Sequence, residues 1–135
     1  MSFLIDTDIC SLHLRGDRRL FSRFNQHLGH LHVSAITVAE MFVWVRRSAA
    51  SVARRSALQK LLRDVAALNV DVIIGEKFGD IRTSQLATGQ FTPEMDLLIA
   101  ATALVHGLTL VTHNVQDFAS VPGLHVIDWL VLCHS

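Results

Sequence analysis

The strongest constraint on the fold is a repeated alternation of short apolar runs with longer segments of helical periodicity. The runs at 2–5, 31–35, 108–112 and 124–130 are short and bounded by polar residues, which predicts strands. Strands that alternate with helices form βαβ units, in which helices cover both faces of a parallel sheet. We therefore expect an α/β fold, a single domain over residues 1–135 with a small, mostly parallel central sheet.

Apolar residues at three- and four-residue spacing predict the helices between these strands. The segment 70–74 fits either a short strand or the start of a helix that runs to about Thr88. The helix with the clearest ends has Thr92 as N-cap, Pro93 in its first turn and Gly107 as its C-terminal stop. The other predicted helical segments are 7–14, 20–28, 38–45 and 58–68.

Several classes of protein are disfavoured by the composition. No apolar run approaches the ~18 residues that a membrane helix needs, and the N-terminus lacks the basic start of a secretory signal. The two cysteines, Cys10 and Cys133, lie near opposite ends without a CxxC spacing. We therefore expect reduced thiols in a protein of the cytoplasm.

The net charge of zero hides an uneven distribution of charge. Ten of the twelve Lys and Arg residues lie between Arg15 and Arg63, where the acids are Asp17 and Glu40, and seven acids follow residue 70. These arginines and lysines could solvate helix faces. They could instead form a basic rim that attracts a polyanion such as nucleic acid.

Acidic and amide residues follow the predicted strands. Asp6 closes the first strand and Asp8 comes two residues later, while Asn114 and Asp117 follow the run at 108–112. Ligands of parallel sheets collect beyond the carboxyl ends of the strands. The sequence therefore places these side chains at the edge where a ligand is expected.

Two further acids lie on predicted helices. Asp96 shares a helix face with Ile99 and Ala100, which is the face expected to pack on the sheet, and Glu40 lies in the helix after the second strand. Each acid also has a structural interpretation. These alternatives are an N-cap for Asp6 or Asp8, a capping box of Thr37 with Glu40, and the positive helix end for Asp96.

Converging carboxylates under a sheet edge need a partner. An unpaired buried carboxylate is strongly disfavoured, and several together raise one another's pKa values. A divalent cation removes both problems, and oxygen ligands without His or Cys favour Mg²⁺ or Mn²⁺. Such an ion can activate water against a phosphodiester.

The histidines and aromatic residues offer weaker signals. His27, His30 and His32 resemble a ligand cluster, but no Cys or His pair accompanies them, so we expect surface or inter-subunit packing. Trp44, which follows Met41 and Phe42, fits a core position or, as the alternative, a groove for a partner.

Four stretches of the chain resemble PIN-domain proteins, and specifically the VapC-type toxins of bacterial toxin–antitoxin modules. They are "FLIDTDICS", "HVSAITVAEMFVWV", "FGDIRTSQLATGQ" and "MDLLIAATALVHGLTLVTHNVQDFASVPGLHVIDW", in the family's order. The resemblance implies that Asp6, Glu40 and Asp96 hold the metal. The chain has Asn114 where many relatives have a fourth acid, which Asp117 could replace, and Met95 where many have Asn.

The resemblance also implies a fold and a function. The expected fold is a three-layer α/β/α PIN domain, and the expected activity is Mg²⁺- or Mn²⁺-dependent cleavage of RNA, commonly tRNA or ribosomal RNA. A homodimer is usual, as is inhibition by a small VapB-type antitoxin, which gives a heterotetramer or a larger complex.

Two surfaces are predicted for these partners. We expect the antitoxin to bind as a helix in a groove near Met41, Phe42 and Trp44. We expect the RNA backbone to be held, without reading of sequence, by the arginines that follow the Glu40 helix. These are Arg46, Arg47, Arg54, Arg55 and Arg63.

Two other functions fit parts of the sequence. A haloacid-dehalogenase-like phosphatase also begins with Asp-x-Asp after its first strand, as in "IDTDIC", and Ser34 could imitate its second motif. That family needs a Lys near the phosphate and a later acidic pair, which this chain lacks. A catalytically degenerate PIN domain that serves as a binding scaffold is the alternative without enzymatic activity, and the three intact acids argue against it.

Overall fold

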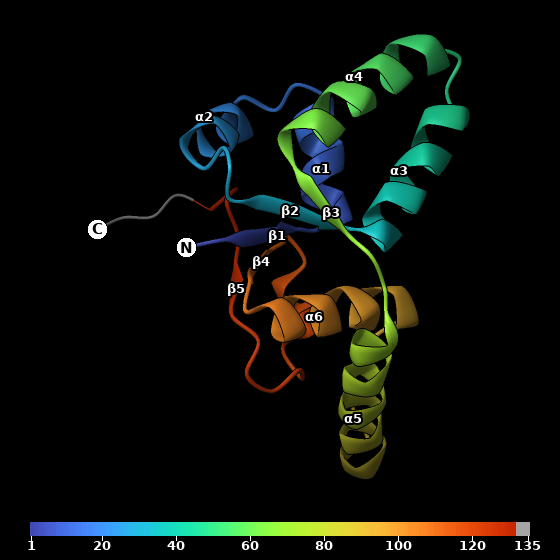
Figure 1. The fold of residues 1–135 in the computed structure, drawn as a ribbon, viewed down its shortest axis with the longest axis vertical. Helices are drawn as coiled ribbons and strands as arrows, with labels where there is room; N and C mark the ends of the chain where they lie inside the picture. Colours follow the sequence, from blue (N-terminus) through green and yellow to red (C-terminus); the bar gives the residue numbers. More distant parts are fainter. Residues whose placement is uncertain (132–135) are drawn as a thin grey trace.

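The centre of the molecule is a fully parallel five-stranded sheet in the order β3-β2-β1-β4-β5 (Figure 1). The computed structural model describes residues 1–131, so Cys133 lies outside it. All connections between paired strands are crossovers, as parallel strands require. The strands are β1 (Phe3–Ile5), β2 (Leu31–Ser34), β3 (Ala66–Leu68), β4 (Thr109–Val111) and β5 (Val126–Ile127).

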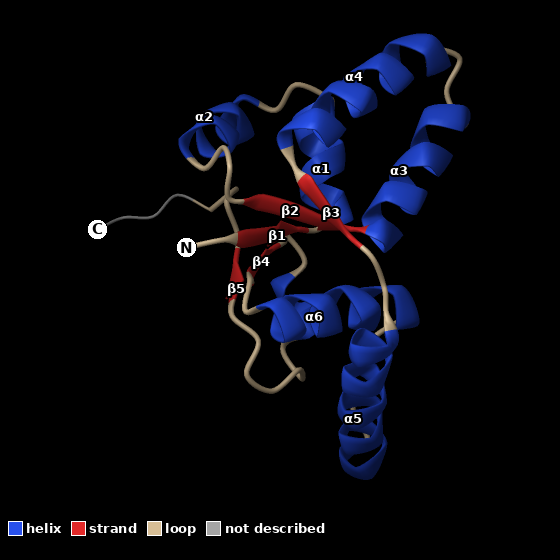
Figure 2. Cartoon of the chain, viewed as in Figure 1, coloured by secondary structure: helices blue, strands red, loops and turns tan. Residues whose placement is uncertain are grey.

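Helices cover both faces of this sheet, which confirms the three-layer α/β/α expectation (Figure 2). On one face lie α1 (Thr7–Leu14), α2 (Arg18–Gln26), α3 (Ala35–Arg46) and α4 (Ser51–Asp64). On the other lie α5 (Val72–Thr88) and α6 (Glu94–His106), with the short 3₁₀ helix η1 (Val115–Phe118) after β4.

The central strand shows how a short apolar run serves both layers. Side chains of a strand alternate between its two faces, so Phe3 and Ile5 enter the core under α1–α4 while Leu4 enters the core under α5 and α6. All three are buried. A three-residue strand without a polar face therefore fits only a sheet that is covered on both sides.

The strand order also fixes where a ligand crevice forms. The chain leaves β1 toward β2 and β3 on one side and returns to β4 and β5 on the other. The crossovers on the two sides diverge at the carboxyl ends of β1 and β4, which is the switch point where open α/β sheets bind ligands. Asp6 directly follows β1 there.

Helices α3 and α4 form a hairpin that extends from the sheet at the top right of Figure 1. Met41 and Val45 of α3 pack with Leu58 and Leu61 of α4 in the core of that face. The hairpin carries most of the arginines of the basic segment, which are exposed or half-buried.

Two local expectations were wrong. The apolar stripe 58–68 does not continue as helix, because α4 ends at Asp64 and residues 66–68 form the edge strand β3. Pro93, not Thr92, is the N-cap of α6, because the buried Thr92 hydroxyl instead accepts a hydrogen bond from Gln85 Nε2 at 2.8 Å. Of the two alternatives for residues 70–74, the start of a helix that runs to Thr88 is confirmed.

Of the three histidines, His30 lies at the surface as expected, while the half-buried His27 and His32 pack within the subunit. The ring of His27 lies 4.6 Å from that of Phe3 and 5.4 Å from that of Trp129. His32 Nδ1 lies 3.3 Å from the carbonyl oxygen of Phe3. None of the helices described over residues 1–131 is both long enough and apolar enough to span a membrane.

Candidate active site

Asp6 is the most buried acid at the switch point. Its side chain is 5% exposed and accepts hydrogen bonds from the Thr7 N–H and from Thr112 Oγ1, each at 2.8 Å. The carboxylate caps the N-terminus of α1, so the prediction that Asp6 is an N-cap is confirmed. Burial, and next the charge of Asp8, raise the pKa of Asp6 from 3.8 to about 7. A cap alone gives no reason for such burial.

Asp8 ties the turn after β1 to the turn after β4. Its carboxylate accepts hydrogen bonds from the N–H groups of Ile9 at 2.8 Å and His113 at 3.0 Å. Burial raises the pKa of Asp8 despite these bonds. The buried Thr112 hydroxyl lies between the two acids, since its oxygen is 2.8 Å from Asp6 Oδ2 and 3.5 Å from Asp8 Oδ2.

Glu40 reaches the same edge from α3. Ser34 is the N-cap of that helix, so Thr37 lies inside it and the predicted capping box with Glu40 is wrong. The Glu40 side chain instead accepts a hydrogen bond from Thr7 Oγ1 at 2.7 Å. Thr7, which directly follows Asp6, therefore positions the Glu40 carboxylate next to the turn that contains Asp6.

Asp96 lies in the first turn of α6 and is half-buried. Burial raises the pKa of Asp96, followed by the charges of Asp117, Glu40 and Asp8. The charge of Asp96 in turn raises the pKa of Asp6. Five acids from four separate parts of the chain therefore act on one another electrostatically.

Of the two candidates for the fourth position, Asp117 has the stronger electrostatic connection to the other acids. It lies in η1, and its charge is the largest contribution of a neighbouring group to the raised pKa of Asp96. Asn114 precedes η1 and donates its backbone N–H to Thr112 Oγ1 at 3.1 Å, so it supports the hydroxyl that binds Asp6.

The donor chemistry of this cluster fits a divalent cation. Within residues 1–131, none of the five acids forms an ion pair with Lys, Arg or His. Within the same residues, no three Asp, Glu, His or Cys side chains are placed closely enough together to hold a metal ion without moving. The available donors are carboxylate, hydroxyl and amide oxygens, which are the ligands of Mg²⁺ and Mn²⁺.

A groove of about 400 Å³ opens beside Glu40. Thr7 and Glu40 form the part nearest the acids, and Val43 and Trp44 form an apolar wall. The remaining lining residues are Arg15, Arg47 and Arg54. A strongly basic wall therefore directly adjoins the acidic cluster.

The structure separates the five arginines that the sequence grouped together. Arg47 and Arg54 line the groove beside Glu40, whereas Arg46 and Arg55 line a different hollow of about 210 Å³. Arg63 is exposed in the last turn of α4. Only part of the predicted RNA-binding set thus lies next to the acids.

The three aromatic and sulfur residues proposed for the antitoxin groove do not share one surface. Met41 is 1% exposed and belongs to the core, because its helix face, with Thr37 and Val45, packs toward the sheet and α4. It does not line an exposed groove. Phe42 and Trp44 are half-buried, with Arg55 over the first ring and Arg54 over the second.

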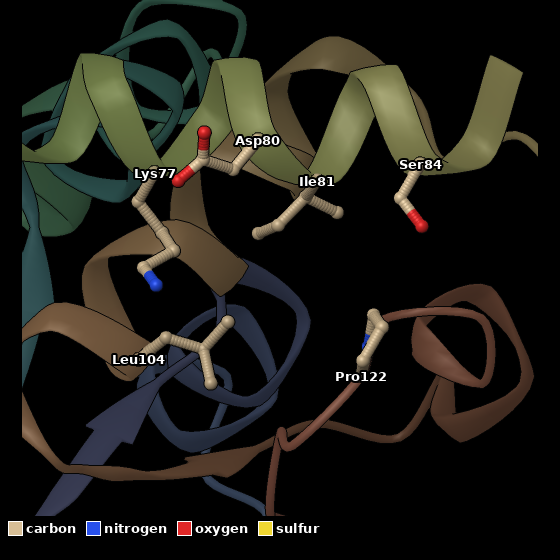
Figure 3. Close-up of a pocket in the computed structure, with 6 residues that line it drawn as sticks. All are labelled: Lys77, Asp80, Ile81, Ser84, Leu104 and Pro122. Carbon is tan, nitrogen blue, oxygen red and sulfur yellow. The ribbon is translucent and has the colours of Figure 1, made fainter. Parts of the chain in front are cut away.

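A second pocket, drawn in Figure 3, lies away from the acids. Lys77, Asp80, Ile81 and Ser84 of α5 face Leu104 and Pro122 across a volume of about 220 Å³. Leu104 is eight residues after Asp96 on α6, which is about 12 Å along the helix. The pocket contains none of the five coupled acids.

Sequence reasoning missed the two threonines and one arginine of this site. Thr7 and Thr112 hold carboxylates that lie 33 and 106 residues away along the chain. No local spacing reveals such pairs. Arg15 could have been found, because it begins the basic segment and directly follows α1.

The chain is similar to known ribonucleases over nearly its full length. The PIN domain family model matches residues 3–124. Ribonuclease VapC2 of Haemophilus influenzae is 30% identical and the tRNA(fMet)-specific endonuclease VapC of Shigella flexneri 26%, each over 96% of this chain and 99% and 98% of the relative. A solved DNA-bound VapBC complex from Salmonella typhimurium superposes with a TM-score of 0.90 at 25% identity, covering 96% of this chain and 98% of that one. The chain belongs to the PIN domain family, as a ribonuclease of the VapC type.

Proposed function

We propose that this protein is a Mg²⁺- or Mn²⁺-dependent endoribonuclease toxin of a VapBC-type module that acts in the cytoplasm. The observation that carries the proposal is the set of mutually coupled acids at the switch point, which lack an ion-pair partner within residues 1–131. Asp6, Glu40 and Asp96 would hold the cation, with Asp117 or Asn114 at its open side. The purified protein should cut a structured RNA with Mg²⁺ or Mn²⁺ and stop when EDTA is added.

The hydroxyl groups, the acids and the arginines at this site have separate roles. The Thr112 and Thr7 hydroxyls fix the orientation of the Asp6 and Glu40 carboxylates. A divalent cation held by these acids would supply an activated water and would neutralise charge on the leaving oxygen of the phosphodiester. The arginines near the acids attract the RNA backbone, which the acids alone would repel.

Thr112→Val tests the positioning of Asp6. The valine keeps the shape of the buried side chain but removes the hydroxyl that binds Asp6 and accepts from Asn114. Loss of a group that orients a metal ligand lowers activity by about 10–100-fold, and we expect a loss of RNA cleavage in this range.

Thr102→Val is the matched control for this substitution. Thr102 is equally buried, but its hydroxyl donates only to Leu98 O within α6. Cleavage rates of both variants, measured with the midpoint of urea unfolding, separate a catalytic from a structural effect. Equal cleavage by the two variants at equal stability would show that Thr112 does not position Asp6.

The proposed substrate is tRNA or ribosomal RNA. The Shigella flexneri relative is named for its action on initiator tRNA. The arginines of α3 and α4 are proposed to hold the RNA backbone without reading its sequence. They are Arg46, Arg47, Arg54, Arg55 and Arg63.

The proposed partner is a VapB-type antitoxin bound to a toxin homodimer. Similar structures are VapBC complexes from Salmonella typhimurium and Haemophilus influenzae. With Met41 in the core, the remaining candidates for the antitoxin contact are the half-buried Phe42 and Trp44. Heterotetramers or larger complexes follow if each protomer binds one antitoxin.

Addition of the antitoxin should slow hydrogen exchange in the second half of α3. A helical tail seated on Phe42 and Trp44 excludes water from this segment and restrains its opening. Exchange measured by mass spectrometry, with α5 as internal reference, checks the result. Unchanged exchange in α3 together with slower exchange elsewhere would place the interface on another element.

A catalytically degenerate scaffold is the second candidate function. It predicts weak or absent binding of Mn²⁺, whereas the nuclease predicts saturable binding that Asp96→Asn abolishes. Calorimetric titration of the metal-free protein with Mn²⁺ distinguishes the two.

A further inference from the structure

The groove beside Glu40 has a charge distribution that a metal site alone does not explain. Glu40 and Thr7 line it together with three arginines, Arg15, Arg47 and Arg54. Within residues 1–131, none of these three arginines forms an ion pair with a carboxylate. Three unpaired cations in one hollow form a site for an anion that lies directly next to the acids.

We propose that this groove is a subsite for the nucleotide adjacent to the cleaved linkage, with its phosphate held by Arg15, Arg47 and Arg54. The inference rests on the proposed RNA-cleaving function and goes beyond it by assigning one phosphate to three residues. Guanidinium groups match phosphate oxygens in charge and in geometry. A cation held by the acids would neutralise only the phosphate that it contacts, so the arginines would supply the positive charge for the neighbouring phosphate.

The groove is partly organised before RNA binds. Arg54 Nη1 donates to Trp44 O at 2.9 Å, and its guanidinium carbon lies 4.4 Å from the centre of the Trp44 ring. These contacts hold the Arg54 group at the groove wall, which reduces the entropy lost on binding. The apolar surface of Val43 and Trp44 fits a ribose or base, and about 400 Å³ is within the range of small-ligand pockets.

Arg18 of α2 and Lys60 of α4 provide a matched control. Both side chains are exposed, neither lines the groove, and neither belongs to the arginines proposed to hold the RNA backbone. Their removal takes the same charge from the chain as the loss of Arg15 and Arg47. It leaves the surroundings of Glu40 unchanged.

The test compares Arg15→Gln/Arg47→Gln with Arg18→Gln/Lys60→Gln on a short RNA that contains the cleavage site, with Mg²⁺. All four side chains are exposed, so both variants should unfold at the wild-type temperature. We expect the groove variant to raise KM by about tenfold or more, since hydrogen bonds to charged groups are the stronger ones, and the control to stay within about threefold of wild type. The dependence of log affinity on log salt should flatten by about 0.7 in the groove variant, the value for one lost phosphate contact on a single strand.

A neutral methylphosphonate at each linkage next to the cleaved one identifies the phosphate. At one of these positions, the neutral linkage should weaken cleavage by the wild type and by the control variant. The groove variant has already lost the contact to that phosphate, so the same neutral linkage should not weaken its cleavage further. If the loss of cleavage from the neutral linkage and the loss from the arginine substitutions add fully at both positions, the subsite is overturned.

The outcomes separate the two proposals. Wild-type protein that leaves RNA uncut with Mg²⁺ overturns the proposed function and the subsite with it. Normal wild-type cleavage with equal KM values for the two double variants overturns the subsite alone. A groove variant that cleaves normally but escapes inhibition by the antitoxin also overturns it, because the groove then binds protein.

Discussion

Glu40→Gln and Asp96→Asn should each abolish RNA cleavage while leaving the free energy of unfolding of the metal-free protein equal or higher. Each substitution removes a carboxylate proposed to hold the cation, and such ions contribute several kcal/mol to the transition state, which corresponds to about a thousandfold in rate. Stability should not fall, because burial, and next the charges of Asp117 and Glu40, disfavour ionised Asp96 in the native chain. Cleavage in Mg²⁺ and urea unfolding in EDTA measure the two effects.

Glu94→Gln is the control for both substitutions. Glu94 lies in the same first turn of α6 as Asp96, is mostly exposed and only approaches Arg82 at 3.9 Å. It should cleave RNA at the wild-type rate. An Asp96→Asn or Glu40→Gln protein that unfolds would instead show that the missing acid is structural.

The metal-free protein should lose stability as the pH rises from about 4 to 7, and Asp6→Asn should remove much of this loss. The pKa of Asp6 is raised from 3.8 to about 7, so the folded chain keeps a proton that the unfolded chain releases in this window. Its contribution to stability is complete below pH 3.8 and lost above about 7. A shift of this size corresponds to about 4 kcal/mol.

Urea unfolding in EDTA at pH 4 and pH 8 gives the measurement. The Asn variant should exceed the wild type at pH 8 and match it at pH 4, and Asn can keep the cap on α1. Mg²⁺ at about a hundred times its dissociation constant should stabilise the wild type at pH 8 by ~2.7 kcal/mol and leave the variant unchanged. A difference between the two proteins that is the same at both pH values would refute the assignment to Asp6.

Four of the five strands were predictable from short apolar runs in the sequence, and the edge strand β3 was not. β1, β2 and β4 lie in the middle of the sheet, where burial on both faces favours mostly apolar residues. β3 lies at the edge, and Ala66 and Ala67 are exposed, so its residues carry little strand signal and follow a helical stripe. Tertiary pairing with β2 determines its structure.

The acids of the site were predictable for a similar reason. A carboxylate that directly follows an apolar strand lies at a known edge of the sheet, which identified Asp6, and the inward helix face identified Asp96. The threonine contacts and the division of the arginines depend on which side chains meet across the fold. Met41 was assigned wrongly because an apolar helix stripe looks the same whether it faces a core or a partner.

The position of β1 at the middle of the sheet bears on when this enzyme becomes active during its synthesis. Asp6 is made at the start of translation, but its partner Thr112 lies 106 residues later, directly after the strand that pairs with β1 in register Ile5–Val111. Domains fold as their residues emerge, and contacts of long sequence separation form late. A nascent chain that has not passed β4 lacks Thr112, Asp117 and the pairing of β1 with β4, so the ribosome that makes this protein is exposed to a folded nuclease only after β4 and η1 have been made.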